Sequence, residues 1–153
     1  MSYNINFQAV ATALSNLTIP GVNTILDLDE LKANAKNQPD PILIPHPKGF
    51  ITNFSLSDRT FGTNGSETWT VKYNVNYRYL HAPIGARLDF GEYQNMINNI
   101  SIILGTLMTD DTLANAADDV TVKTVETIGG VVDPAGLLHH GCDIVIQIVQ
   151  YSE

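Results

Sequence analysis

Two histidines, the only cysteine of the chain and an aspartate fall within five positions of the stretch GLLHHGCDIVIQIVQY. These residues are His139, His140, Cys142 and Asp143. Such residue types can ligate a metal ion, and a thiol beside an imidazole can act as a nucleophile with its base. Adjacent histidines point to opposite sides of an extended chain, however, and a zinc site usually needs a second ligand pair elsewhere. No such pair is visible, so a composite site would have to recruit His46 or His81.

The cysteine has a plainer interpretation, because it opens a predicted strand. At such a position cysteine most often serves as a small buried hydrophobe. We therefore interpret HHGC as a polar turn, with Gly141 supplying backbone freedom, that leads into a buried last strand. On this basis the sequence predicts no catalytic residue, no cofactor and no metal ligand. A small metal- or ligand-binding enzyme that uses the turn from His139 to Cys142 stays open as the alternative.

Two acidic pairs in the stretch DDTLANAADD form the other candidate cation site. They are Asp110, Asp111, Asp118 and Asp119. Calcium loops place their acidic ligands at every second position, which this stretch does not do. We therefore expect an acidic surface that faces solvent, DNA or a partner. The glycines give no further lead, because none has the spacing of a dinucleotide- or phosphate-binding loop.

The composition limits the classes of function. The 153 residues are the usual size of a single domain, which we expect to span 1–153. A hydrophobic content of 44% beside a charged content of 16% indicates a subunit that hides surface in an assembly. The formal charge of −8 disfavours electrostatic binding to the negatively charged phosphates of nucleic acids.

The expected compartment is the cytosol, without a membrane. One cysteine cannot form an internal disulfide, and no arginine-led apolar leader precedes MSYNIN. The longest apolar run, IVIQIV, is far shorter than the about 20 residues that a membrane helix needs.

The first third of the chain predicts one helix and two strands. Apolar residues at helical spacing predict a helix over 5–18, which Pro20 and Gly21 close. The β-branched run VNTILDL predicts a strand, followed by the polar, proline-broken stretch DELKANAKNQPDP. Prolines on both sides of residues 42–44 limit that run to an edge strand or a short strand.

A long hairpin over residues 50–80 is the clearest β-signal. In FITNFSLS, alternate residues face one way, namely Phe50, Thr52, Phe54 and Leu56. In TWTVKYNVNYRYL, alternate residues from Trp69 to Tyr79 form a stripe that we expect to be core against a helix. The other side, Thr-Thr-Lys-Asn-Asn-Arg, is then either solvated or a subunit contact. Asn64-Gly65 marks the turn, and the ten-residue tip DRTFGTNGSE is longer than a hairpin needs.

The remainder predicts a second amphipathic helix over 91–108 and a C-terminal strand pair over 120–151. The two closing strands, VTVKTVETI and CDIVIQIVQY, are joined by a segment in which Asp133-Pro134-Ala135-Gly136 is turn chemistry. No alternation of strand and helix calls for a parallel sheet. The fold class is therefore expected to be α+β, a mainly antiparallel sheet with a long hairpin, covered by two amphipathic helices.

In the hairpin that ends in WTVKYNVNYRYL, the helix GEYQNMINNISIILGTL and the closing strand CDIVIQIVQY, the chain resembles tail terminators and related head-tail joining proteins of long-tailed bacteriophages. The resemblance implies a non-enzymatic virion protein whose copies form a ring, typically a hexamer. That ring would terminate the tail tube, join it to the head and let DNA pass without specific binding. The tail tube protein and a head-tail connector would be its partners, and assembly would take place in the host cytoplasm. A head-completion or neck protein is the alternative within this class.

Under this resemblance, the tip from Ser57 to Thr68 is a candidate for contact with a neighbouring subunit or the tube, through Arg59, Phe61 and Asn64. A mobile tip without such a contact is the alternative interpretation. The four aspartates of DDTLANAADD are candidates for the wall of the central hole, where negative charge would keep DNA from sticking.

Overall fold

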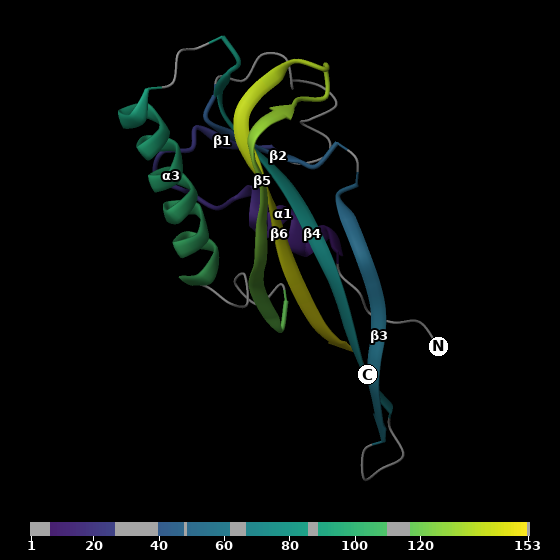
Figure 1. The fold of residues 1–153 in the computed structure, drawn as a ribbon. Coiled ribbons are helices and arrows are strands. Elements are labelled where there is room, and N and C mark those ends of the chain that lie inside the picture. The colour runs from purple at the N-terminus through teal and green to yellow at the C-terminus, as the bar shows by residue number, and fades with distance from the viewer. Residues whose placement is uncertain are drawn as a thin grey trace.

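The structure is a computed structural model that describes residues 7–26, 40–47, 49–61, 67–85, 89–109 and 117–152, with the side chains of 57–61, 67–69 and 152 left aside. Two helices and six strands make up these residues (Figure 1). Their order is α1 (Phe7–Ser15), β1 (Thr24–Ile25), β2 (Ile42–Pro45), β3 (Ile51–Phe61), β4 (Glu67–Pro83), α3 (Phe90–Thr109), β5 (Asp119–Val132) and β6 (Leu138–Ser152).

The six strands form one sheet around β4. Its order is β1-β2-β4-β6-β5, and β3 pairs with β4 further along the edge that β2 also uses. All pairs are antiparallel except β1 with β2. The predicted α+β class with a mainly antiparallel sheet is therefore confirmed. Of the first predicted strand, VNTILDL, the structure describes residues 22–26, and Thr24 and Ile25 form β1. Residues 42–44 form the short strand that the flanking prolines indicated.

One face of the sheet carries the main core. Alternate residues of β4 and β6 point to this face, because their side chains repeat every second residue. The predicted stripe is buried from Val71 to Tyr79, and α1 and α3 cover it. Both helices lie where the spacing predicted them, with α1 shorter than 5–18 and α3 close to 91–108. Their buried residues are Val10, Leu14, Met96, Ile100, Ile103 and Leu107.

Most of the described opposite face of β4 is buried within the chain, so the alternative that this face is solvated is wrong there, while the alternative that it forms a subunit contact stays a prediction. Thr70, Asn74, Asn76 and Arg78 are all less than 9% exposed. The end of the β5–β6 hairpin arches back over this face (Figure 1). Beneath the arch lies a second small core, formed by Leu26, Ile42, Ile44, Leu80 and Val131. The chain itself therefore covers the end of this polar side near Arg78, while Asn74 and Asn76 face an open cavity and Lys72 is partly exposed.

A β-bulge in β3 corrects the predicted alternation of FITNFSLS. The register shifts between Thr52 and Ser55, and Asn53 takes a left-handed conformation with φ of 54°. Asparagine tolerates this conformation better than most residues. Ile51 and Leu56 pair with Val75 and Val71 on the helix-covered face, whereas Thr52 lies on the other face. The extra residue changes the side to which the preceding residues point.

Both hairpin connections are shorter than the sequence indicated. Strand pairing continues to Phe61 opposite Glu67, so only residues 62–66 join β3 to β4. The prediction of a ten-residue tip is therefore wrong. In the C-terminal hairpin, β5 and β6 extend to Val132 and Leu138. The predicted turn chemistry at its end is confirmed, since the Asp133 carboxylate accepts hydrogen bonds from the amides of Ala135 and Leu137.

The HHGC segment lies inside β6 and is not a turn. Gly141 is needed there for close packing: a Cβ on it would collide with the carbonyl oxygen of Tyr79 on the neighbouring strand. The register shift between Leu80 and Ala82 lies at this same point. No described helix has the combination of length and apolar character that crossing a bilayer demands.

Replacing Gly141 by alanine is expected to lower the free energy of unfolding by about 1–3 kcal/mol, because the added methyl must push two paired strands apart. Urea unfolding followed by circular dichroism measures this loss. Gly105→Ala is the matched control: this helical glycine has nothing within 4 Å of a built Cβ, so alanine there should stabilise by roughly 0.5–1 kcal/mol. Equal effects at the two positions would contradict the close-packing account.

Candidate functional site

An open polar cavity of about 330 Å³ lies on the sheet face opposite the helices. Residues at the start of β3 and the middle of β4 form one wall, and β5 forms the other. Its lining comprises His46, Gly49, Thr52, Asn53, Asn74, Asn76, Lys123, Thr124, Glu126, Asp143 and Val145. The volume lies at the lower end of the range for small-ligand sites.

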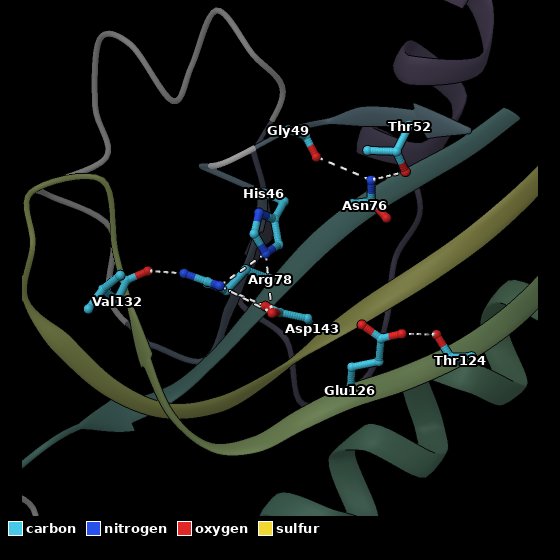
Figure 2. A network of polar contacts seen from close by, with 9 residues as sticks. All are labelled: His46, Gly49, Thr52, Asn76, Arg78, Thr124, Glu126, Val132 and Asp143. Carbon is cyan, nitrogen blue, oxygen red and sulfur yellow. Dashed lines mark hydrogen bonds and ion pairs between the residues drawn. The ribbon is translucent and has the colours of Figure 1, made fainter. Parts of the chain in front are cut away.

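One end of the cavity is fixed by a buried ion pair (Figure 2). Arg78 donates from Nε to Asp143 Oδ1 at 2.7 Å and from Nη2 to Oδ2 at 3.1 Å. Nη1 donates to the carbonyl oxygen of Val132 in the arch at 2.9 Å. Nε2 of His46 lies 3.0 Å from Nη2 and 3.2 Å from Asp143 Oδ2, so it can accept from the guanidinium or, when protonated, donate to the carboxylate. The pair therefore holds β4, β6, the arch and the segment after β2 together.

Asn76 fixes the wall next to this pair. Its Nδ2 donates to the carbonyl oxygen of Gly49 at 3.2 Å and to Oγ1 of Thr52 at 2.9 Å (Figure 2). The backbone amide of Asn76 donates to the carbonyl oxygen of Phe50. Backbone and side-chain hydrogen bonds of Asn76 therefore both fix the residues at which β3 begins. Asn76 Oδ1 accepts no hydrogen bond from the described residues, and neither does the hydroxyl of Thr52 donate one.

Asn74 is the unusual member of the lining. It is 4% exposed, and its side-chain amide makes no hydrogen bond with any residue that the structure describes. The amide faces the open cavity, so its hydrogen-bonding capacity is directed there and not to another part of the described chain. Since this amide lines the cavity, whatever occupies the cavity can supply the missing bonds.

The rim of the cavity has balanced charge. Lys123 and Glu126, both exposed, stand on β5. Register shifts on either side of Thr124–Glu126 bend the strand at this point, and Thr124 donates to the Glu126 carboxylate at 3.1 Å. The Asp143 charge is compensated by Arg78. One cation and one anion therefore remain at the opening.

His139 lies in a separate cluster at the base of the arch. Its Nδ1 is 2.7 Å from Asp40 Oδ2 and its Nε2 is 2.9 Å from Asp133 Oδ2. Burial disfavours the charged ring, but the hydrogen bonds to Asp133 and Asp40 outweigh it and raise the pKa of His139 above its usual 6.5. Burial also acts to raise the pKa of Asp133, and the bonds from His139 and Leu137 more than reverse this, lowering it below 3.8.

His81 belongs to a third cluster, on the helix-covered face. Nδ1 of His81 lies 2.7 Å from the Tyr79 hydroxyl, and Nε2 lies 3.0 Å from Glu92 Oε1 on α3. Asn99 donates to the same hydroxyl at 3.1 Å. Burial raises the pKa of Tyr79 to about 12, so this hydroxyl stays protonated at neutral pH. The cluster binds α3 to β4.

The structure separates the residues that a histidine-cysteine enzyme would need. His46, His81 and His139 lie in three different clusters, and Cys142 is buried in the main core. Burial raises the pKa of the Cys142 thiol to about 12, which keeps the thiolate from forming at neutral pH. Within the described ranges, no three His, Cys, Asp or Glu side chains are grouped so as to hold a metal ion.

The other predicted site residues are only partly described. Arg59 and Phe61 belong to β3, with side chains outside the description, and Asn64, Asp110 and Asp111 lie outside it altogether. Asp118 and Asp119 are exposed where β5 begins. Asp118 Oδ2 accepts from the amide of Tyr151 at 2.6 Å, which ties it to the end of β6. Their place in a central hole stays a prediction.

Neither models of known protein families nor curated proteins give a match to the chain.

Of the cavity residues, the sequence singled out only His46 and Asp143, and it did so for a different site. Asn74, Asn76 and Arg78 were noticed only as the polar side of a strand, and Asp143 only as part of HHGCD. The only feature of the sequence that pointed to the cavity was the length of this polar run. Six alternating polar residues on a strand that crosses the core need hydrogen-bond partners on that face.

Replacing Arg78 by methionine is expected to lower the free energy of unfolding by about 3–5 kcal/mol, because Asp143 is left as an unpaired buried charge. The double variant Arg78→Met/Asp143→Leu should be more stable than Arg78→Met, which urea unfolding measures. Lys123→Met removes an exposed cation from the same cavity and should change stability by less than about 0.5 kcal/mol. Strict additivity of the two substitutions would contradict the pairing.

His139 gives stability a defined pH dependence. Because its pKa is raised by folding, its contribution is complete below 6.5 and is lost as the pH rises through the higher folded value. Asp133 acts oppositely: its contribution is present above 3.8 and is lost as the pH falls through its lowered pKa. His139→Gln should remove about 2 kcal/mol at pH 6 and less at pH 9, by urea unfolding. An unaltered pH profile in His139→Gln would refute the assignment.

Proposed function

We propose that this chain is a non-enzymatic structural protein of a long-tailed bacteriophage, whose copies form a ring that terminates the tail tube and joins it to the head. The tail tube protein and the head-tail connector are the proposed partners, and DNA passes through the ring. The fold class expected from the resemblance is the one observed. The net charge of −8 suits a conduit that must not hold DNA.

The observation that carries this proposal is the arm formed by residues 54–61 of β3 and 67–73 of β4. The arm runs on beyond the part of the sheet beside α3 (Figure 1). Phe54 and Leu56 on it are 54% and 46% exposed, and the Phe54 ring stacks on Tyr73 at 5.4 Å. Neighbouring exposed apolar side chains on one strand are typical of a surface that a neighbouring molecule covers.

The polar clusters also favour a structural role. Each described cluster of titratable side chains connects two or more elements: Arg78 with Asp143, His139 with two aspartates, and His81 with Glu92. Their hydrogen-bonding groups are therefore used for holding the fold. This is what a subunit under mechanical load needs.

Ring formation tests the proposal. Native mass spectrometry and electron microscopy of the purified protein, alone and with purified tail tubes, should reveal a closed ring. The double variant Phe54→Ser/Leu56→Ser should lose the ring, with the subunit dissociation constant raised at least about tenfold, because each exposed apolar side chain contributes to the contact. Its circular dichroism spectrum should match the parent, since both side chains are half exposed.

Phe90→Ser is the matched control, because Phe90 is 97% exposed but belongs to the start of α3. It should leave the ring intact. A protein that stays monomeric both alone and on tail tubes would overturn the proposed function.

A further inference from the structure

The cavity has hydrogen-bonding capacity that the described chain does not use. The Asn74 amide offers two donors and an acceptor while only 4% exposed, and Asn76 Oδ1 offers a further acceptor. Asn76 is held in position by Gly49 and Thr52, so its free oxygen has a fixed direction. A site with prearranged donors and acceptors favours a ligand that presents both kinds of group.

The charge and composition of the lining narrow the class of ligand. Arg78 compensates Asp143, and Lys123 and Glu126 at the rim balance each other, so an uncharged occupant fits best. The described lining contains no phenylalanine, tyrosine or tryptophan ring on which a nucleobase would stack, and the imidazole of His46 is held against Arg78 and Asp143. Asparagine amides resemble the peptide group and can bond to its N–H and C=O together. An uncharged polypeptide segment with small side chains meets all these conditions.

We propose that the cavity receives residues 62–66 of a second copy of this chain. That segment reads Gly-Thr-Asn-Gly-Ser, which is uncharged and small throughout. Its two glycines leave the main chain accessible to the Asn74 and Asn76 amides. The inference rests on the proposed function, because it names the contact by which neighbouring subunits in the ring hold each other.

The segment cannot enter the cavity of its own chain. From Asn53 at the cavity to Phe61 at the end of β3 the strand covers eight residues, or roughly 26 Å at about 3.3 Å per residue. Five connecting residues must leave Phe61 and return to Glu67 directly opposite, so they extend less than roughly 10 Å from that end. The occupant therefore comes from a neighbour. A contact between two different patches, tip and cavity, is head-to-tail, which is the kind that closes rings.

Disulfide trapping between copies tests the contact. Lys123→Cys at the cavity rim and Asn64→Cys in the tip are made as separate proteins, mixed and oxidised mildly. The native Cys142 does not interfere, because it is fully buried. The mixture should yield a covalent dimer of one copy of each at a level at least about tenfold above either protein alone. Replacing the first partner by Gln94→Cys, exposed on α3, should give none.

A peptide experiment separates this inference from the proposed function. A cyclised peptide of residues 60–68 is added to the full-length protein, and the Asn74 side-chain amide signals are followed by NMR, with Asn74→Gln to assign them. The signals should shift on binding, and Asn74→Leu should weaken binding by about tenfold or more. A ring without the mixed disulfide, or an unshifted Asn74 amide, overturns the inference while the ring stands. Peptide binding by a protein that never forms a ring supports the cavity contact and refutes the proposed function.

Discussion

The burial of Arg78 and Asp143 on the sheet face opposite the helices is the constraint on which the rest of the structure depends. A guanidinium removed from water destabilises a fold unless its donors are taken and a compensating charge is adjacent. Asp143 supplies the charge, and Val132 takes a further donor from across the arch. The arch is tied to the ion pair through the Val132 carbonyl, and the small second core and the polar cavity adjoin the pair on the same face. The apolar residues of the second core, Leu80 among them, are buried beside the pair on this face.

The parts of the fold that depend on local periodicity could be predicted from the sequence. Helical spacing indicated α1 and α3, and the alternation from Val71 to Tyr79 indicated the helix-covered core, because each pattern is a direct result of backbone geometry. The second face could not be predicted in this way. A polar alternation looks the same whether water, a neighbour or the same chain covers it, and here the covering carbonyl lies 54 residues away. The bulge at Asn53 left no signal either, apart from a residue type that tolerates positive φ.

The histidines show why spacing along the chain was a poor guide to chemistry. Sequence proximity suggested one site around His139 and Cys142, and the extended chain places the two on different faces with different neighbours. His139 is paired with Asp40, 99 residues earlier, and His46 with Arg78 and Asp143. Each of these pairings is fixed by the topology of the sheet, which brings distant strands together. In the described residues, the side chains of His81 and His139 therefore link elements that are far apart in the chain.

The continuous pairing of β4 with β6 has a mechanical consequence. The two strands are in register from Trp69 opposite Ser152 to Pro83 opposite His139, interrupted by one shift near Gly141. Their hydrogen bonds run perpendicular to the strands. A force that pulls on the arm along β4 therefore loads many of these bonds in shear at the same time, instead of opening them one after another. Tension applied at the tip of the arm is therefore transmitted to the body of the subunit while the β4–β6 strand pair stays intact.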